Sequence, residues 1–433
     1  MNDIEKMIES LCPEGVEFRT LDELGYFYSG LTGKTKIHFE NGNCKYVTYM
    51  NIYKNPALNT NITDTVKITE GENQHKIEYG DILFTSSSET ADECGMSSVV
   101  NEKINEDIYL NSFCFGFRLN RVSDFSPDYL KHLFRSRNLR KQISLTASGV
   151  TRFNISKKKF SKIVIPVPPL EIQQKIVKVL DIFTELEATL EAELSLRKKQ
   201  YEYYRNKLLT FDNITDRGGY GSNPIWRRLA ELCPKGVPMV ALGEVGTFIR
   251  GNGLQKKDFV ENGVGCIHYG QIYTYYGTFT HTTKSFVSEE FANKAKMASF
   301  GDLVMATTSE NVGDVCKAVA WLGKEDIAVS GDALIIKHNQ NPKYIAYLFQ
   351  TKHFLDFKKM YATGTKVIRV STDNLKKYQF HLPPLEVQQM IVDILDKFDK
   401  LVNDLTKGLP AEINARRQQY EYYRNTLLTF KER

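Results

Sequence analysis

Loops rich in basic, amide and hydroxyl side chains occur at matching places in the two halves of the chain. They are Gly30–Lys36, Thr85–Thr90 and Ser148–Asn154 in the first half, and Gly251–Lys257, Thr307–Asn311 and Thr363–Arg369 in the second. Lys and Arg bind phosphates, and Arg, Asn, Gln and hydroxyl side chains also form hydrogen bonds to base edges. One such loop alone is more often an ordinary solvated turn, but recurrence in both halves favours a shared binding role.

These loops predict a nucleic-acid-binding surface in each half. The candidate contact residues are Lys34, Lys36, Ser86, Ser87, Ser88, Thr151, Arg152 and Asn154 in the first half, and Gln255, Lys256, Lys257, Thr307, Thr308, Asn311, Lys366 and Arg369 in the second. The loop sequences differ strongly between the halves, whereas the helices that follow stay alike. Two surfaces that bind two different targets on one scaffold would show that contrast.

A long amphipathic helix occurs twice in the chain and must position these loops. Pro168–Phe211 and Pro383–Phe430 both open with PPLE, contain QYEYYRN and end with LLTF. In the first copy, apolar residues recur at alternating spacings of four and three, a heptad-type stripe over roughly 60 Å of helix. The stripe consists of Ile176, Leu180, Phe183, Leu190, Leu194, Tyr201, Tyr204 and Leu208, with Glu187 and Arg197 as interruptions, and it returns as Ile391, Leu395, Phe398, Val402, Leu405 and Leu409.

The two stripes predict an antiparallel coiled coil. One amphipathic helix could simply cover its own domain, but two copies with matching stripes favour packing against each other. The connecting segment Asp212–Pro224 is too short to lead the chain back along such a rod, so the second helix must run in the opposite direction. We expect a kink or break near Pro410, because an interior proline removes a helical hydrogen bond.

Each helix follows a turn-rich segment of short β-like runs, which predicts an α+β protein with an internal repeat. Predicted strands include Cys44–Met50 and Gly80–Phe84 in the first half, and Gly265–Gln271 and Gly301–Met305 in the second. We expect two similar α/β domains, separated by two long antiparallel helices that form a coiled coil with pseudo-twofold symmetry. The predicted boundaries are 1–166 for the first domain (the first head), 167–211 for the first helix, 212–223 for a linker, 224–382 for the second domain (the second head) and 383–430 for the second helix.

Composition is that of an ordinary globular protein. The 433 residues are 42% hydrophobic and carry a formal charge of +5, which permits contact with a polyanion without requiring it. The seven cysteines include no C-x-x-C pair, so neither a zinc site nor a disulfide framework is indicated, and a reducing compartment fits best. No window approaches the roughly 20 apolar residues of a membrane span, and no signal-peptide core is present. We therefore expect a cytoplasmic protein.

Catalytic motifs are missing from the sequence. There is no G-x-x-x-x-G-K-[ST] loop, no glycine-rich dinucleotide fingerprint after a βαβ pattern and no acidic nuclease cluster. The Asn-Pro-Pro-aromatic tetrapeptide of adenine methyltransferases is missing too, with Asn223-Pro224-Ile225-Trp226 as the nearest approach. The histidines are scattered without metal-ligand spacing. The residues therefore offer no recognisable catalytic, cofactor or metal site.

The repeated helices resemble those of a known family. PPLEIQQKIVKVLD with QYEYYRNKLLTF, repeated as PPLEVQQMIVDILD with QYEYYRNTLLTF, closely resembles the conserved regions of specificity (S) subunits of type I restriction-modification systems. The similarity covers nearly the whole chain. It implies a non-catalytic subunit in which each head is a target-recognition domain for one half of a split double-stranded DNA target, and the helices fix the gap between the halves.

The resemblance also implies partners. Two modification (methyltransferase) subunits would dock alongside the helices and methylate adenine, and restriction (motor-nuclease) subunits would complete the enzyme. S-adenosylmethionine, ATP and Mg are then expected only on those partners. The expected docking face is the outer face of the helices, with Glu171, Gln173, Gln174, Arg197, Lys198, Lys199, Glu386, Gln388 and Gln389. The QYEYYRN segments are expected to anchor each helix end against the neighbouring head.

Two other functions stay open at this point. One is a free-standing DNA methyltransferase with an unrecognised cofactor site, which methyl transfer by the chain alone would support. The other is a coiled-coil assembly protein that does not contact DNA, which would be favoured if a complex with modification subunits failed to bind DNA.

Overall fold

The structure is a computed structural model that describes residues 2–211 and 223–433, and these form two compact units. Unit 1 contains Met1–Glu191 with Glu412–Arg433, and unit 2 contains Ala192–Ala411. Each unit therefore holds one head together with those parts of the long helices that pack on it. The predicted linker 212–223 lies outside the described residues, except for Asn223.

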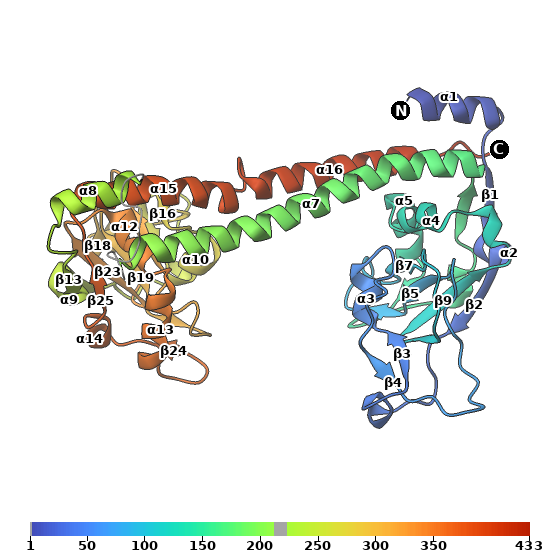
Figure 1. Cartoon of the computed structure of the whole chain (residues 1–433), viewed down its shortest axis with the longest axis horizontal. Coiled ribbons are helices and arrows are strands. Elements are labelled where there is room, and N and C mark those ends of the chain that lie inside the picture. Colours follow the sequence, from blue (N-terminus) through green and yellow to red (C-terminus); the bar gives the residue numbers. More distant parts are fainter. Residues whose placement is uncertain (1, 212–222) are drawn as a thin grey trace. The chain divides into compact units, whose positions relative to one another are not determined.

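The first head is built from short strands and short helices (Figure 1). The strands are β1 (Glu17–Thr20), β2 (Gly25–Ser29), β3 (Cys44–Val47), β4 (Thr65–Val66), β5 (Ile82–Thr85), β6 (Ser87–Ser88), β7 (Ser97–Val99), β8 (Ile108–Leu110), β9 (Cys114–Leu119), β10 (Ala147–Ser148), β11 (Phe153–Ile155) and β12 (Val164–Val167). The helices are α1 (Asn2–Leu11), α2 (Leu21–Leu24), η1 (Lys36–Phe39), α3 (Tyr49–Lys54), η2 (Val122–Asp124), α4 (Pro127–Leu133), α5 (Arg137–Ser144) and α6 (Lys157–Phe160). They build an antiparallel sheet of order β2-β9-β5-β7, the smaller sheets β4-β3-β8 and β10-β11-β6, and the pair β1-β12.

Aromatic side chains fill the core of the first head. Phe84 of β5 is fully buried, and its ring centroid lies 5.3 Å from that of Phe115 and 4.9 Å from that of Phe160. Leu133 of α4 and Ile143 of α5 belong to the same cluster, so both helices cover this sheet. Burying each such side chain contributes roughly 1.5–3 kcal/mol, which makes the sheet and its two helices one rigid support.

The second head repeats this plan. Its strands are β13 (Met239–Ala241), β14 (Gly246–Arg250), β15 (Val264–Ile267), β16 (Phe279–Thr280), β17 (Ser285–Val287), β18 (Met297–Ala298), β19 (Leu303–Ala306), β20 (Thr308–Ser309), β21 (Ala318–Trp321), β22 (Ile327–Val329), β23 (Ala333–His338), β24 (Ile368–Arg369) and β25 (Gln379–His381). Its helices are α8 (Pro224–Leu232), α9 (Leu242–Val245), η3 (Lys256–Asp258), α10 (Tyr269–Thr274), α11 (Glu289–Ala292), α12 (Pro342–Leu348), α13 (Lys352–Tyr361) and α14 (Thr372–Leu375). The sheets β14-β23-β19-β21-β16 and β17-β15-β22-β18 match the two larger sheets of the first head, each with one extra edge strand. The pair β13-β25 matches β1-β12, and the pair β20-β24 matches β6 and β11 without a counterpart of β10.

Two predicted strands each end early and continue as a helix. Cys44–Met50 divides into β3 and α3, because the Thr48 hydroxyl accepts a hydrogen bond from the Asn51 amide at 3.3 Å and so caps the helix. Gly265–Gln271 divides in the same way into β15 and α10, with the imidazole of His268 as the cap. The strands predicted at Gly80–Phe84 and Gly301–Met305 are confirmed as β5 and β19.

The first long helix is continuous. Helix α7 (Leu170–Leu209) has 40 residues, and most of the predicted apolar stripe is buried, with Ile176 and Leu180 fully so. In unit 1 its amino-terminal part packs on α16 (Leu409–Leu427), where Phe183 stacks on Tyr423 at 5.0 Å. Glu187, which interrupts the stripe, forms a short ion pair with Arg417 of α16. Because Tyr423 follows Arg417 while Phe183 precedes Glu187, these two helices are antiparallel.

In unit 2 the carboxy-terminal part of α7 packs on α15 (Leu385–Asn403). Tyr201 and Tyr204 of α7 both stack on Phe398 of α15, at 6.2 and 5.5 Å between ring centroids. Two tyrosines of the QYEYYRN segment, Tyr201 and Tyr204, thus belong to the helix-to-helix contact, as the stripe predicted.

The second long helix is broken, as expected, but upstream of the proline. Helix α15 ends at Asn403 and α16 begins at Leu409, so Pro410 stands in the first turn of α16, where its missing amide costs nothing. The interruption also overturns one position of the predicted stripe, because Leu405 lies in it and is 79% exposed. Among the described residues, no helix is long and apolar enough to span a membrane.

Candidate nucleic-acid interface

In the first head, two of the predicted loops come together as one small sheet. Strand β6 pairs with β11, so that Ser87 lies opposite Asn154 and Ser88 opposite Phe153. The guanidinium of Arg152 donates to the Ser87 hydroxyl at 3.0 Å and lies 5.9 Å from the ring of Phe113. Ser87, Ser88, Thr151 and Arg152 therefore share one site, and all four line a hollow of about 560 Å³.

Aromatic residues from outside the predicted loops line the rest of this hollow. Tyr49 and Tyr53 are stacked side chains of α3, and the Tyr49 hydroxyl donates to the Ser87 carbonyl at 2.8 Å. The Tyr53 hydroxyl donates to Glu93 at 2.8 Å, a hydrogen bond that lowers the pKa of Glu93 and raises that of Tyr53. Phe113 is 59% exposed at the rim. Exposed rings beside an Arg provide stacking surfaces for bases, in addition to hydrogen bonds.

The second head builds the same strand pair from different residues. Strand β20 pairs with β24, so that Thr308 lies opposite Arg369 and Ser309 opposite Ile368. The hydroxyl of Tyr273 in α10 donates to the Thr308 carbonyl at 2.5 Å, which corresponds to the Tyr49–Ser87 bond of the first head. The tyrosines of α3 and α10 could have been found from the sequence, since Tyr49 and Tyr53 are four apart and that spacing returns at 269 and 273.

The basic residues Arg152 and Arg369 hold different positions in the two strand pairs. Arg369 lies opposite Thr308 as Asn154 lies opposite Ser87, so Arg369 corresponds to Asn154 rather than to Arg152. The position of Arg152, two residues earlier, is held in the second head by Val367. The hairpins therefore present different side chains at the same positions.

A glycine makes the hairpin turn possible in each head. Gly149 has φ +151° and Gly364 has φ +105°, which are conformations that other residues rarely adopt. A Cβ atom on Gly149 would lie 2.0 Å from the Arg152 carbonyl oxygen, and one on Gly364 would lie 2.1 Å from that of Val367.

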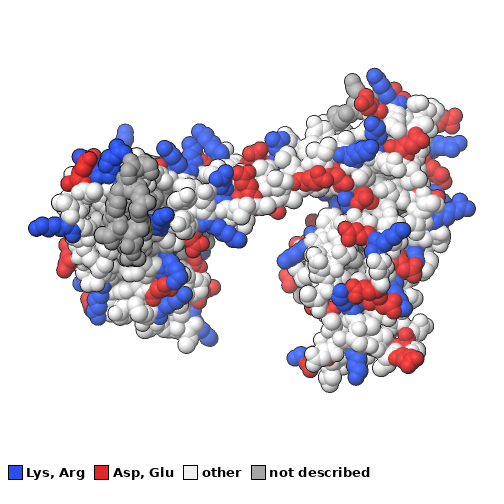
Figure 2. All heavy atoms as spheres, viewed as in Figure 1, with Lys and Arg blue, Asp and Glu red and all other residues white. Residues whose placement is uncertain are grey.

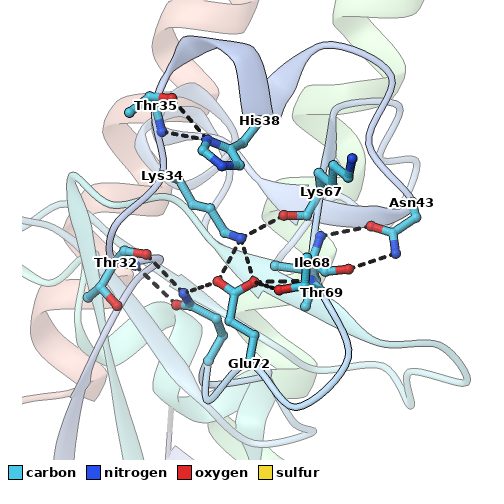
Figure 3. Close-up of polar contacts among 10 residues, drawn as sticks. Thr32, Lys34, Thr35, His38, Asn43, Lys67, Ile68, Thr69 and Glu72 are labelled. Carbon is cyan, nitrogen blue, oxygen red and sulfur yellow. Dashed lines mark hydrogen bonds and ion pairs between the residues drawn. The ribbon is translucent and has the colours of Figure 1, made fainter.

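Lys34 is held inside its own loop (Figure 3). Its ammonium donates to the Lys67 carbonyl at 2.6 Å and to Glu72 at 2.7 Å, and its side chain is 5% exposed. The hydrogen bond from Lys34 is the main reason why the pKa of Glu72 falls to about 2. This charge is already paired, so we assign Lys34 to the structure of its loop rather than to a DNA-binding surface.

The other candidate contact residues are mostly at the surface. Lys36, Asn154, Gln255, Lys256, Lys257, Asn311, Lys366 and Arg369 are exposed, and Ser86 and Thr307 are partly buried. Thr307 donates through its hydroxyl to the Asp332 carbonyl at 2.9 Å, and Asn311 donates to Asp314 at 2.7 Å. On the face drawn in Figure 2, cationic and anionic side chains are interspersed over each unit, which fits the small net charge.

Two residues expected on the outer face of the helices are buried instead. Gln173 and Gln388 are fully buried, because each side chain bonds to the backbone of its own head. Gln173 accepts from the Ser126 amide at 2.8 Å and donates to the Asp124 and Pro168 carbonyls. Gln388 accepts from the Asn341 amide at 3.0 Å and donates to the Pro383 carbonyl.

The remaining residues of the expected docking face are accessible. Glu171, Gln174, Lys198, Lys199 and Gln389 are exposed, and Arg197 is partly so. Glu386 is exposed but accepts two hydrogen bonds from Arg228 of α8, at 2.8 and 2.7 Å.

The QYEYYRN segments anchor the helix ends on the heads, as expected. Asn206 of α7 accepts a hydrogen bond from the backbone amide of Lys352, the first residue of α13, at 2.7 Å. Asn425 of α16 accepts one from the amide of Arg137, the first residue of α5, at 2.9 Å. Each asparagine thereby satisfies a free amide at a helix start.

A buried histidine completes the junction in unit 1. The imidazole of His132 in α4 lies 2.8 Å from the Tyr420 hydroxyl of α16 and 2.8 Å from an Asp181 oxygen of α7. Burial lowers the pKa of His132, which favours its neutral form. In unit 2 the corresponding contact is made by Tyr347, whose hydroxyl donates to Asp396 of α15 at 2.7 Å. No group of three or more His, Cys, Asp or Glu residues that could hold a metal occurs in the described parts of the chain.

Comparison with known proteins identifies the repeat. A family model described as "Type I restriction modification DNA specificity domain" matches residues 13–196 and 234–415. A Haemophilus influenzae protein named as a type I restriction enzyme specificity subunit is 32% identical over 296 residues, or 65% of this chain and 68% of that protein. The specificity subunit of an Escherichia coli type I restriction enzyme is 31% identical over 278 residues, or 62% of this chain and 63% of that protein.

A solved structure shares the fold. It comes from work on complex assembly and conformational transition of the type I restriction-modification system, and it matches with a TM-score of 0.61 at 18% identity over 96% of this chain and 98% of that chain. The family model covers both heads, including the strand pairs at Arg152 and Arg369. The chain therefore belongs to the family of DNA specificity subunits of type I restriction-modification systems.

Proposed function

We propose that this chain is the DNA-sequence-recognition subunit of a type I restriction-modification complex, and that each head binds one half of a bipartite double-stranded target. In the first head the binding surface is the hollow around Arg152, together with the hairpin that carries it. In the second head it is the strand pair around Arg369.

The observation that supports this proposal best is the repeated strand pair with unlike side chains. Both heads place a tyrosine hydroxyl on the carbonyl of the first residue of β6 or β20, Ser87 or Thr308, so the backbone frame is the same. At the two hairpin positions that share a strand face, the first head has Arg152 and Asn154, whereas the second has Val367 and Arg369. Arg favours guanine and Asn favours adenine in the major groove, so the two heads suit different half-sites.

We further propose that the long helices fix the spacing between the half-sites and bind the partner subunits. The 40 residues of α7 are one uninterrupted helix, which is a stiff element. The exposed residues Glu171, Gln174, Lys198, Lys199 and Gln389 supply a polar face for two modification subunits. Adenine methylation and DNA cleavage, with S-adenosylmethionine, ATP and Mg, belong to the modification and restriction subunits, and the complex acts in the cytoplasm.

Mapping methylated adenines tests the proposal. The chain is produced with its modification subunits in cells that lack other adenine methylation, and the genome is mapped. We expect one bipartite motif, with two defined half-sites and a gap of constant length. A contiguous motif, or methylation without a motif, would contradict two-headed recognition.

The alternatives predict other results. A free-standing methyltransferase would transfer radiolabelled methyl groups from S-adenosylmethionine to DNA without partners, and we expect no transfer by the purified chain. A pure assembly protein would form the complex with modification subunits, but that complex would not retard DNA in a gel.

A further inference from the structure

Helix α5 of the first head connects the long helices to the recognition surface. In Figure 1 it lies between the sheet of this head and the pair α7 and α16. Its first residue, Arg137, donates its amide to Asn425 of α16. One turn later, Arg140 donates to three backbone carbonyl oxygens of the turn between β6 and β7, those of Asp92 at 2.7 Å, Cys94 at 2.5 Å and Gly95 at 2.5 Å.

Helix α13 of the second head makes the same two contacts with different residues. Its first residue, Lys352, donates its amide to Asn206 of α7. Lys358, which is 3% exposed, donates to the carbonyl oxygens of Gly313 and Val315 at 2.7 Å each. Aligned on β6 and β20, Gly313 and Val315 hold the positions of Asp92 and Cys94.

The turns that these cations hold are part of the candidate surfaces. We call residues 89–96 and 310–317 the recognition turns. The first contains Glu93, which accepts from Tyr53 inside the hollow, and the second contains Asn311, a candidate contact residue bonded to Asp314. Both turns pass through a left-handed residue at the same place, Gly95 with φ +60° and Cys316 with φ +63°.

A cation is needed because the turn aims several carbonyl groups at one point. Buried carbonyl oxygens without a donor cost about 1–3 kcal/mol each, and one guanidinium or ammonium can satisfy several of them. Burial lowers the pKa of Arg140 to about 10, so its guanidinium is still charged at neutral pH. An apolar side chain in place of the cation would leave these carbonyl oxygens without that donor.

On the basis of the proposed function, we propose that Arg140 and Lys358 are positioning residues for DNA recognition. Each one fixes the recognition turn of its own head to a helix, α5 or α13, that is itself anchored to the long helices. Arg140 thereby sets the contacts to the first half-site, and Lys358 sets those to the second. Neither residue touches DNA in this proposal.

The test uses the complex of the full chain with its modification subunits and duplexes that carry the mapped target. Binding is compared between the full target, a duplex altered in the first half-site and a duplex altered in the second. The variants are Arg140→Met and Lys358→Met, with Arg140→Lys and Lys358→Arg as conservative changes. Lys141→Met and Lys359→Met are matched controls, because each is the exposed neighbour of a positioning residue.

We expect Arg140→Met to reduce discrimination at the first half-site by about tenfold or more, since one wrong base pair typically costs ~1–3 kcal/mol. Discrimination at the second half-site should stay within about twofold of the parent's. Lys358→Met should show the reverse pattern. The conservative variants should recover most of the discrimination, and the controls should behave as the parent.

Unchanged discrimination in the Met variants, equal loss at both half-sites, or no recovery with the conservative variants would each overturn the proposal. If a Met variant does not fold, Arg140→Gln or Lys358→Gln takes its place, because an amide still donates to one carbonyl, and the same outcomes decide. Failure of the parent complex to discriminate at either half-site would instead refute the proposed function.

Discussion

The hairpin glycines allow one head to be disabled at a time. Replacing Gly149 by Ala places a methyl group 2.0 Å from the Arg152 carbonyl oxygen, at a residue whose φ is +151°. The obstacle is a backbone atom, so no side-chain rotation relieves the contact. The hairpin must therefore open, and Arg152 and Asn154 lose the positions that pairing with β6 gives them.

The size of the effect follows from backbone strain and from the lost contacts. Forcing a residue other than glycine into such a conformation costs about 1–3 kcal/mol. The surface loses Arg152 and Asn154 at once, and a tenfold change in affinity corresponds to about 1.4 kcal/mol. We therefore expect about a 10- to 100-fold loss of affinity, confined to the first half-site.

The assay is competition binding by the assembled complex with duplexes altered in one half-site. Gly364→Ala is the matched variant in the second head, where the methyl group meets the Val367 carbonyl at 2.1 Å, and it should affect only the second half-site. Gly277→Ala is the control, because it lies outside the predicted loops and nothing lies within 4 Å of the added Cβ. The tip of the first hairpin is outside the core, with Val150 93% exposed, so the thermal unfolding transition should match the parent's.

Unchanged binding by Gly149→Ala would show that the hairpin is not part of the DNA surface. Equal loss at both half-sites would show that the heads do not act separately. Either result would refute the reasoning from the hairpin.

Three further predictions concern the supports of the heads. Gln388→Leu leaves the Asn341 amide and the Pro383 carbonyl without these partners, so we expect about 2–5 kcal/mol of destabilisation in chemical denaturation. Gln389→Leu, at the exposed neighbour, should be nearly neutral. The pKa of the Glu72 carboxylate is lowered to about 2, from about 4.5 in the unfolded chain. Its pairing with Lys34 therefore stabilises the loop fully above about pH 4.5, and this stabilisation is lost as the pH falls from 4.5 towards 2. Hydrogen exchange should show loosening of the loop over that window. Lys34→Met, which removes the largest cause of the lowered pKa, should weaken this pH dependence, while the hydrogen bonds from Thr69 and Gln74 preserve part of it. The third change inserts about one helical turn within 185–196 of α7, with a matching insertion in 404–408. It should lengthen the gap of the methylated motif and leave the half-sites unchanged. A constant gap would contradict the proposal that the long helices fix the spacing between the half-sites.

The repeated helices could be predicted well because their signal is periodic and local. The 4-3 spacing predicted the buried positions Ile176, Leu180, Ile391 and Leu395, all of which are fully buried. Pro410 correctly indicated that the second helix is interrupted nearby. The interruption falls at Asp404–Gly408, and Pro410 itself lies in the first turn of α16, where a proline is tolerated. Sequence spacing alone does not distinguish these two outcomes.

Other features depend on contacts between distant residues. Lys34 looked like a free cation because its partner, Glu72, stands 38 positions away. Gln173 and Gln388 looked like outer-face residues because the backbone amides that bond to them, those of Ser126 and Asn341, belong to the heads. The correspondence of Arg369 with Asn154 needed the strand register, which places Thr308 opposite Arg369.

Replacing the hairpin Ser148–Asn154 in the first head, and mapping methylated adenines again, tests two-headed recognition most directly. The account predicts a motif in which one half-site changes while the other half-site and the gap stay as in the parent. A change in both half-sites, or an unaltered motif, would contradict it.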